Sequence, residues 1–206
     1  VMCNSIRSKI LSRIYGHGGG WIFSSHDFIG DFRRYEIDQT LSSLAKAGDI
    51  RRVLRGIYDY PRYSDLLKRP VAPDLSEVAA ALARKFNWNI LPEGNTALNA
   101  LGLSTQIPAK YIYFTSGPDR AYDINGQTLE FRMKSSRETA MRLPESMLVV
   151  HALKTLGETY ATPELIAKLK SRYSADQWRK IKSDTTTVTG WIFDIIRSMA
   201  DEKEPS

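Results

Sequence analysis

Residues 35–61, YEIDQTLSSLAKAGDIRRVLRGIYDYP, decide the fold of the first third of this 206-residue chain. Ile37, Leu41 and Leu44 recur at i, i+4 and i+7, a spacing that predicts an amphipathic helix with a single apolar face. Gly48 follows the last apolar residue, where a glycine can take the left-handed conformation that ends a helix. The sequence therefore predicts a helix that stops at Gly48.

A two-stranded hairpin is predicted directly after this helix. Residues 50–54 favour a strand, Arg55-Gly56 supplies a tight turn, and residues 57–60 return as a second strand that Pro61 ends. A helix that runs into a basic hairpin is the order of elements in a winged helix-turn-helix domain. The first functional expectation is therefore a nucleic-acid partner.

The residues upstream fit the same unit. Apolar residues at positions 6, 10, 11 and 14 predict a first helix, and Ser24 or Ser25 can cap a short second helix that ends at Phe28. The glycine run between them, residues 16–21, has neither the Lys-Ser/Thr of a P-loop nor G-x-G-x-x-G spacing, which favours a turn. We expect Trp21 and Phe23 to be part of the small core.

The face opposite the apolar stripe of the 35–47 helix is rich in groups that bind base edges and phosphates. We expect this face to enter the major groove, while the arginines of the hairpin hold the backbone or reach the minor groove. The candidate DNA-binding residues are Arg33, Arg34, Tyr35, Asp38, Gln39, Ser42, Ser43, Lys46, Arg51, Arg52 and Arg55. A polar helix face is often only a solvated face, and it is the adjoining hairpin that favours DNA.

Charge is unevenly distributed along the chain. Residues 1–70 carry 12 Lys and Arg against 7 Asp and Glu, a balance of +5, whereas residues 71–206 carry 17 against 16, a balance of +1. The attraction for a polyanion is therefore expected in the first third, and the nearly neutral remainder suits a protein-binding or regulatory module.

Cysteine content and hydropathy indicate the compartment. The sequence has one cysteine, Cys3, so an intrachain disulfide or a multi-cysteine metal site is impossible. No apolar run approaches the ~20 residues that span a bilayer, and the start of the sequence lacks the apolar core of a signal peptide. We expect a cytoplasmic protein with no membrane partner.

The composition changes between residues 62 and 74, where prolines discourage a continuous helix and Leu66-Leu67 is predicted to form a short docked turn. We therefore predict a winged helix-turn-helix domain over residues 1–68 and a second domain over residues 69–206.

The second domain is predicted to be α+β, with a small antiparallel sheet and helices on one side. A helix over 78–86, capped by Ser76 or Asp74, is followed by a turn at 90–95 and a helix that stops at Gly102. Residues 110–115 alternate as a strand, and 121–124 pairs with 129–133 across Asn125-Gly126, a strong hairpin signal. Further helices are predicted at 147–156, 163–169, 176–181 and 188–199.

The sequence contains no recognisable catalytic constellation, metal-binding motif or cofactor motif. His17, His26 and His151 lie far apart, and none belongs to a nucleophile or ligand motif. Asp123, Glu130 and Arg132 share one hairpin, where charges usually form the solvated face. We expect a protein that is not an enzyme and needs no cofactor.

Three stretches of the chain resemble the AbiEi-like antitoxin family of bacterial toxin-antitoxin modules, also described as AbiEi-type transcriptional regulators. Residues 48–58, GDIRRVLRGIY, match its pattern G-x-I-x-R-x-x-R-G-x-Y. Residues 61–67, PRYSDLL, are similar to its linker. Residues 97–104, ALNALGLS, with PAKY at 108–111, are similar to the start of its second domain.

The resemblance implies an autoregulating antitoxin of a phage-defence type. Such a protein represses its own operon at inverted repeats in the promoter, for which a homodimer is plausible, and is associated with the nucleoid. It also counteracts a cognate nucleotidyltransferase-like toxin, directly or functionally, through its C-terminal domain. By position Arg51, Arg52 and Arg55 would contact DNA, whereas Gly48, Gly56 and Tyr58 would be structural parts of the hairpin.

Two other functions remain open from the sequence. One is a protein-interaction adaptor that uses the winged helix and the C-terminal domain to bind a protein partner without specific DNA binding. The other is an enzyme acting on nucleic acid, which would lose turnover on chelation or on Asp123→Ala.

Overall fold

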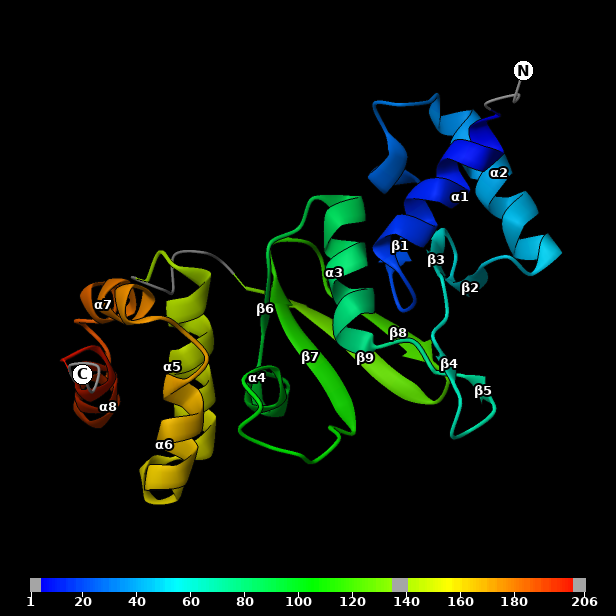
Figure 1. Ribbon diagram of the computed structural model, residues 1–206. Helices are drawn as coiled ribbons and strands as arrows, with labels where there is room; N and C mark the ends of the chain where they lie inside the picture. Colours follow the sequence, from blue (N-terminus) through cyan, green and yellow to red (C-terminus); the bar gives the residue numbers. More distant parts are fainter. Residues whose placement is uncertain (1–4, 135–140, 202–206) are drawn as a thin grey trace. The chain divides into compact units, whose positions relative to one another are not determined.

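A computed structural model describes residues 5–134 and 141–201, which form an α+β structure in two compact units (Figure 1). The N-terminal unit comprises Val1–Asn89 and Ile124–Gly126, and the C-terminal unit comprises Ile90–Asp123 and Gln127–Ser206. The predicted α+β class is confirmed.

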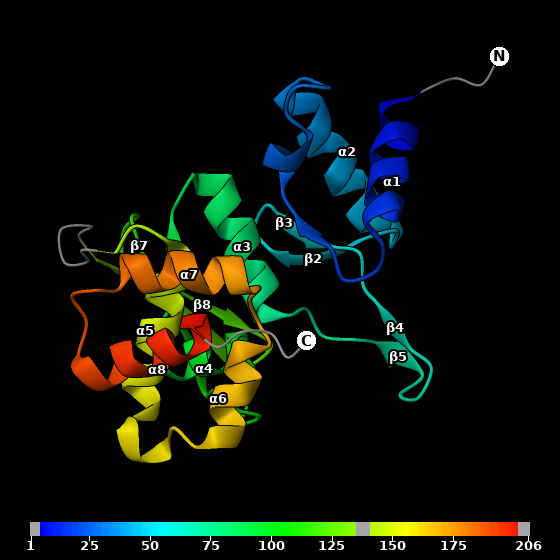
Figure 2. The same ribbon diagram turned by 60° about the vertical axis from the view of Figure 1, so that its left-hand side comes forward.

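The N-terminal unit begins with the elements predicted around the opening stretch. They are α1 (Ile6–His17), β1 (Ile22–Phe23), the 3-10 helix η1 (Ser25–Phe28), α2 (Arg34–Ala47), β2 (Arg51–Leu54) and β3 (Ile57–Asp59). The strands form an antiparallel sheet of order β1-β3-β2. Figures 1 and 2 both show α1 and α2 side by side. Three helical segments thus precede the β2–β3 hairpin, as expected.

The apolar stripe of α2 forms the centre of this unit's core. Ile37, Leu41 and Leu44 are fully buried and pack with residues of α1 and η1. Gly48 ends the helix in the left-handed conformation (φ 83°), and its backbone N–H donates to the carbonyl oxygen of Ala45 at 3.3 Å. The predicted helix stop is confirmed.

The short second helix is a 3-10 helix capped by Ser24. The Ser24 hydroxyl accepts from the N–H of His26, and the Asp27 carboxylate accepts from the N–H of Ser24 at 2.8 Å. Phe23 is fully buried, as predicted, whereas Trp21 is only partly buried at the edge of the same core.

A second hairpin, which the sequence did not predict, follows the first. It consists of β4 (Tyr63–Ser64) and β5 (Arg69–Pro70). Leu66 and Leu67 lie in its loop with 91% and 55% of their surface exposed. The prediction that these two leucines form a docked turn is therefore wrong, because the loop carries them beyond the ends of two very short strands.

Helix α3 (Leu75–Phe86) belongs to the N-terminal unit. Asp74 caps it by accepting from the N–H of Ser76 at 2.8 Å. Arg84 ties the helix to this unit: its guanidinium donates to the Asp27 carboxylate and to the carbonyl oxygen of Ile22, both at 2.8 Å. The division between the units therefore follows α3, later in the chain than the predicted boundary at 68/69.

The sheet of the C-terminal unit contains β6 (Ile90–Pro92), β7 (Lys110–Thr115), β8 (Arg120–Ile124) and β9 (Gln127–Met133) in the order β6-β7-β9-β8. Strand β6 pairs antiparallel with β7, where only a turn was predicted. Strands β7 and β9 pair in parallel, so this sheet is mixed rather than wholly antiparallel. The predicted Asn125-Gly126 turn is present, with both residues at positive φ.

Helices make up the rest of this unit: α4 (Gly94–Ala100), α5 (Pro144–Leu156), η3 (Glu158–Tyr160), α6 (Pro163–Lys170), α7 (Ala175–Asp184) and α8 (Gly190–Asp201). Their core includes Val149, Trp178 and Ile192, each at most 1% exposed. The helices predicted from residue 147 onward are confirmed. Within residues 5–134 and 141–201, none of the helices has the length and hydropathy needed to cross a bilayer.

Candidate nucleic-acid interface

The exposed face of α2 presents polar side chains at a single helical stripe. Tyr35, Gln39, Ser42 and Lys46 follow one another at i, i+4, i+7 and i+11, opposite the buried stripe. Tyr35 is 70% exposed and its hydroxyl accepts from the Gln39 amide at 2.5 Å. Because the apolar stripe fixes the rotation of the helix, this polar face is turned to solvent.

The N-terminal turn of α2 holds three of the candidate charges. The backbone N–H of Arg33 donates to the Glu36 carboxylate at 3.2 Å, while the Arg33 side chain is exposed. Arg34 and Asp38 form an exposed ion pair at 3.8 Å. Asp38 therefore already has a cationic neighbour on its own helix, which offsets its repulsion of a polyanion.

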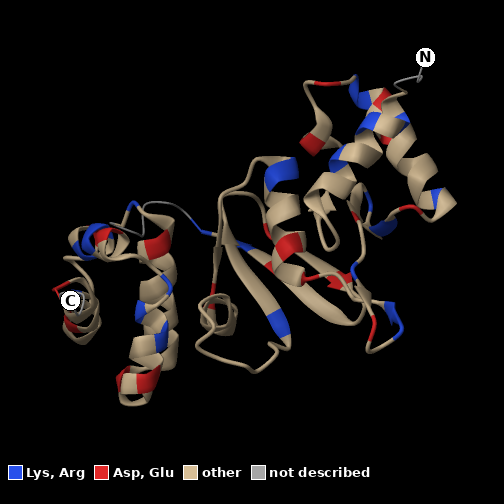
Figure 3. Cartoon of the chain, viewed as in Figure 1, with Lys and Arg blue, Asp and Glu red and all other residues tan. Residues whose placement is uncertain are grey.

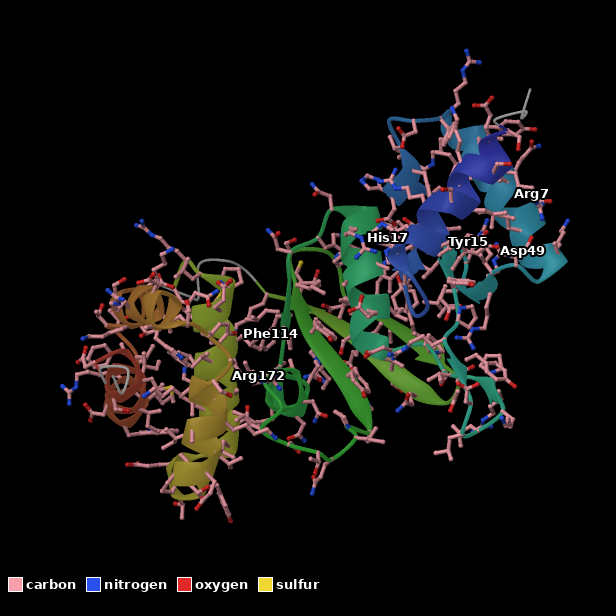
Figure 4. The ribbon with its side chains drawn as sticks, in the orientation of Figure 1. Arg7, Tyr15, His17, Asp49, Phe114 and Arg172 are labelled. Carbon is pink, nitrogen blue, oxygen red and sulfur yellow. The ribbon has the colours of Figure 1, made fainter. Side chains whose placement is uncertain are left out.

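An open hollow of about 550 Å³ lies against the polar face of α2. Its lining residues are Arg7, Gln39, Thr40, Ser42, Ser43 and Lys46. Arg7 comes from α1 and forms an ion pair with Asp49 at 2.6 Å (Figure 4). Arg7 was not among the residues predicted from the sequence, because only the packing of α1 on α2 brings it to this face.

The β2–β3 hairpin presents two exposed arginines. Arg52 pairs across the strands with Tyr58, and its guanidinium lies 5.8 Å from the centre of the Tyr58 ring. Arg55 lies in the turn. Its carbonyl oxygen accepts a hydrogen bond from the Lys85 ammonium at 3.1 Å, and its side chain is exposed. Both arginines are exposed, and a guanidinium group can donate two hydrogen bonds to one anionic group.

Arg51 has a different role from the adjacent Arg52. Its guanidinium makes two hydrogen bonds to the carboxylate of Asp59, which is 1% exposed, with the Nε–Oδ1 distance 3.0 Å. It also donates to the carbonyl oxygen of Val71 at 2.9 Å. We therefore revise the expectation for Arg51: its donors hold the hairpin together. The signal in the sequence was an opposite charge at the facing position of the hairpin.

The asymmetry of charge follows the two units. The N-terminal unit carries 14 Lys and Arg against 9 Asp and Glu, a balance of +5, and the C-terminal unit carries 15 against 14. Figure 3 shows basic segments on α1, α2, β2 and the β4–β5 hairpin. The excess positive charge is therefore in the unit that presents the α2 face.

The three histidines occupy separate environments. The His17 ring stacks on Trp21 with centroids 3.8 Å apart, and His26 is exposed on η1. His151 lies 5.6 Å from the Phe114 ring, and burial, followed by the positive charges of Lys134 and Lys154, lowers its pKa. Among the described residues, no three His, Cys, Asp or Glu side chains are grouped so as to hold a metal ion.

The charged residues of the β8–β9 hairpin and its neighbours pair with one another. Arg132 contacts Glu130 at 2.9 Å and Glu93 at 3.5 Å. The hydrogen bond from Arg132 lowers the pKa of Glu130. A carboxylate held ionised in this way is poorly suited to act as a general base near neutral pH.

Comparison with known proteins identifies a family for this chain and a similarity to a solved structure. The profile of a family of unknown function, DUF6088, matches residues 9–180. No curated protein matches the sequence. The crystal structure of the RV2827C protein from Mycobacterium tuberculosis covers 94% of this chain and 75% of its own, at 13% identity and a TM-score of 0.42. A TM-score of that size does not establish a shared fold.

Proposed function

This chain belongs to the DUF6088 family, and we propose that its N-terminal unit binds duplex DNA in a sequence-specific manner. The observation that carries the proposal is the exposed polar stripe of α2, which is followed at once by a hairpin with two exposed arginines. In this proposal α2 is the recognition helix of a winged helix-turn-helix, and the β2–β3 hairpin is its wing.

The chemistry of the stripe suits the major groove. The amide of Gln39 can form a bidentate pair with adenine, while the hydroxyl groups of Ser42 and Ser43 can bond either bases or phosphates. Lys46 and Arg7, at the hollow beside the stripe, supply the positive charge that a phosphate backbone attracts. Arg52 and Arg55 hold the backbone next to the groove.

The biological setting that we propose is a toxin-antitoxin operon. The likeness of residues 48–58, 61–67, 97–104 and 108–111 to AbiEi-like antitoxins supports a cytoplasmic, nucleoid-associated repressor of its own promoter. A two-fold operator of inverted repeats would be bound by a homodimer. The nearly neutral C-terminal unit would then counteract a nucleotidyltransferase-like toxin, by contact or by another route.

Three variants test which residues contact the bases and which contact the phosphates of the DNA. We expect Gln39→Ala to reduce the preference for a promoter duplex over a scrambled one by about tenfold, since it removes a base contact. We expect Arg52→Ala and Arg55→Ala each to lower the slope of log affinity against log salt by about one, because each removes a phosphate contact.

Arg197→Ala is the matched control, because Arg197 is an exposed arginine of the C-terminal unit that forms an ion pair with Asp194 on its own helix. It should leave both preference and slope unchanged. If the α2 and hairpin variants behave like this control, the α2 face is not the DNA interface. A chain that binds a protein partner but no duplex would favour the adaptor function instead.

A further inference from the structure

The β4–β5 hairpin exposes an apolar tip. Leu66 is 91% exposed, Leu67 is 55% exposed, and Tyr63 at the end of the first strand is 60% exposed. Figures 1 and 2 both show this hairpin as a separate two-stranded ribbon. Adjacent large apolar side chains at the tip of a projecting loop are costly to keep in water and mark a surface that contacts something.

The loop that carries these leucines has a defined conformation. The N–H of Leu67 donates to the Ser64 hydroxyl at 3.2 Å, and Lys68 adopts a left-handed conformation with φ 50°. At the other end of the hairpin, the N–H of Val71 donates to the carbonyl oxygen of Arg62 at 2.7 Å. The ladder therefore extends beyond the two short strands on the side away from the tip.

The base of the β4–β5 hairpin is anchored to the sheet that contains β2 and β3. The Arg51 guanidinium joins Asp59 of β3 to the carbonyl oxygen of Val71. On the other strand, Arg62 lies against the glycine run, where a Cβ at Gly19 would come within 2.9 Å of Arg62 Cγ. The two hairpins are thus held together at their bases, within one unit.

The charge around the tip is positive. Lys68 and Arg69 directly follow the leucines, and Asp65 is the single acidic residue between Pro61 and Pro70. All three side chains belong to exposed residues. An apolar tip with a basic surround is complementary to a partner that offers negative charge beside an apolar interior.

Duplex DNA seen from its minor groove meets this description. Proteins that bend DNA insert leucine and similar side chains between base pairs from the minor groove, and Arg and Lys beside the wedge hold the phosphates. We propose that the β4–β5 hairpin is a second DNA-binding element, which inserts Leu66 and Leu67 into the minor groove and kinks the duplex. This inference rests on the proposed function, because it adds a bend to the duplex that α2 binds.

The test measures bending of DNA by the 206-residue chain. A duplex from upstream of its own coding sequence, with a donor and an acceptor dye at its ends, reports the end-to-end distance by energy transfer. We expect the wild-type protein to bend this duplex by at least about 20°. The double variant L66A/L67A should bind without bending it, and L66M/L67M should retain the bend because methionine also fills the wedge. K68A/R69A should lower the salt slope by up to about two.

Ile107→Ala is the control, since Ile107 is 75% exposed in the C-terminal unit, and it should bend the duplex like the wild type. If L66A/L67A binds and bends the duplex as the wild type does, the proposed insertion of Leu66 and Leu67 is overturned and the proposed function is left intact. A change of oligomeric state in L66A/L67A, measured by light scattering, together with an unbent wild-type complex, would overturn it in favour of a contact between copies. Failure of the wild-type chain to bind any duplex would overturn both proposals.

Discussion

Two adjacent arginines of the β2–β3 hairpin have opposite surroundings. Because side chains alternate across a strand, Arg51 and Arg52 point to different faces of the sheet. Arg51 meets the buried carboxylate of Asp59, whereas Arg52 is exposed beside the Tyr58 ring. The same residue type therefore stabilises the fold at one position and is free to bind a partner at the next.

This contrast predicts that two alanine substitutions affect stability very differently. Arg51→Ala leaves Asp59 buried without its cation, and we expect the free energy of unfolding to fall by about 3 kcal/mol. Arg52→Ala should change it by no more than about 0.5 kcal/mol while lowering the salt slope of DNA binding. Urea denaturation followed by circular dichroism measures the first quantity. Equal stabilities of the two variants would show that the Arg51–Asp59 pair does not hold the hairpin.

His151 predicts a dependence of stability on pH. Its lowered pKa means that the folded protein keeps the imidazole neutral to a lower pH than the unfolded chain does. The unfolded state therefore binds more protons in this range. The contribution to stability is complete above the ordinary pKa of about 6.5 and is lost as the pH falls toward the folded value.

The measurement is the urea midpoint at pH 7.5 and pH 5.5. We expect a smaller loss of stability between these values in His151→Gln than in the wild type. His26→Gln, at an exposed histidine, is the control and should lose as much as the wild type. If His151→Gln loses as much stability as the wild type between these pH values, groups other than His151 cause the pH dependence.

Among the elements, helix α2 ends at Gly48, the glycine that separates it from the β2–β3 hairpin, and substitutions there test whether the left-handed conformation is required. A Cβ at Gly48 would meet nothing within 4 Å, so the cost of a side chain there is conformational. We expect Gly48→Ala to destabilise the protein by about 1 kcal/mol, and Gly48→Asn by less, because asparagine tolerates the left-handed region. Thermal unfolding of both variants checks the order, which would be reversed if the helix simply extended through position 48.

The N-terminus of α5 is capped from a distant helix. Asp184, at the end of α7, accepts hydrogen bonds from the N–H groups of Arg142 at 3.0 Å and Leu143 at 2.9 Å. Burial alone would raise the pKa of Asp184, but these hydrogen bonds outweigh it and lower the pKa. The carboxylate therefore supplies the cap that the Leu143 side chain cannot.

Replacing this cap should loosen the first turn of α5. We expect Asp184→Ala to reduce the free energy of unfolding by about 1 kcal/mol at neutral pH, as lost caps do. Asp194→Ala, at an exposed ion pair on α8, should cost less than about 0.5 kcal/mol. Guanidinium denaturation of both variants gives the comparison, and equal losses would contradict a capping role for Asp184.

The elements that the sequence predicted are those whose signal is local. Spacing of Ile37, Leu41 and Leu44 was enough for α2, and Asn125-Gly126 was enough for the β8–β9 turn. Strand β6 was missed because its three residues become a strand only by pairing with β7, which lies some twenty residues later. The parallel pairing of β7 with β9 was missed for the same reason.

For the whole molecule, the sequence predicted the distribution of charge, but it did not predict all the residues that make up the candidate site. The excess of +5 is in the N-terminal unit whether residues are counted to 70 or to the end of that unit. Arg7 belongs to the candidate site only because α1 packs on α2, and Arg51 binds the carbonyl oxygen of Val71 in addition to the Asp59 that faces it across the hairpin. Leu66 and Leu67 were expected to be covered because apolar pairs usually are, and only the hairpin geometry exposes them.

Sequence-specific DNA binding by the N-terminal unit is the proposal on which the other DNA-binding predictions depend. It is tested most directly by fluorescence anisotropy of the full-length chain titrated into a duplex from its own promoter, beside a scrambled duplex of the same composition, at near-physiological salt. We predict a preference for the native duplex of about a hundredfold or more. Weak and equal binding to both duplexes would contradict the claim, because the basic surface would then act only as a non-specific attraction for polyanions.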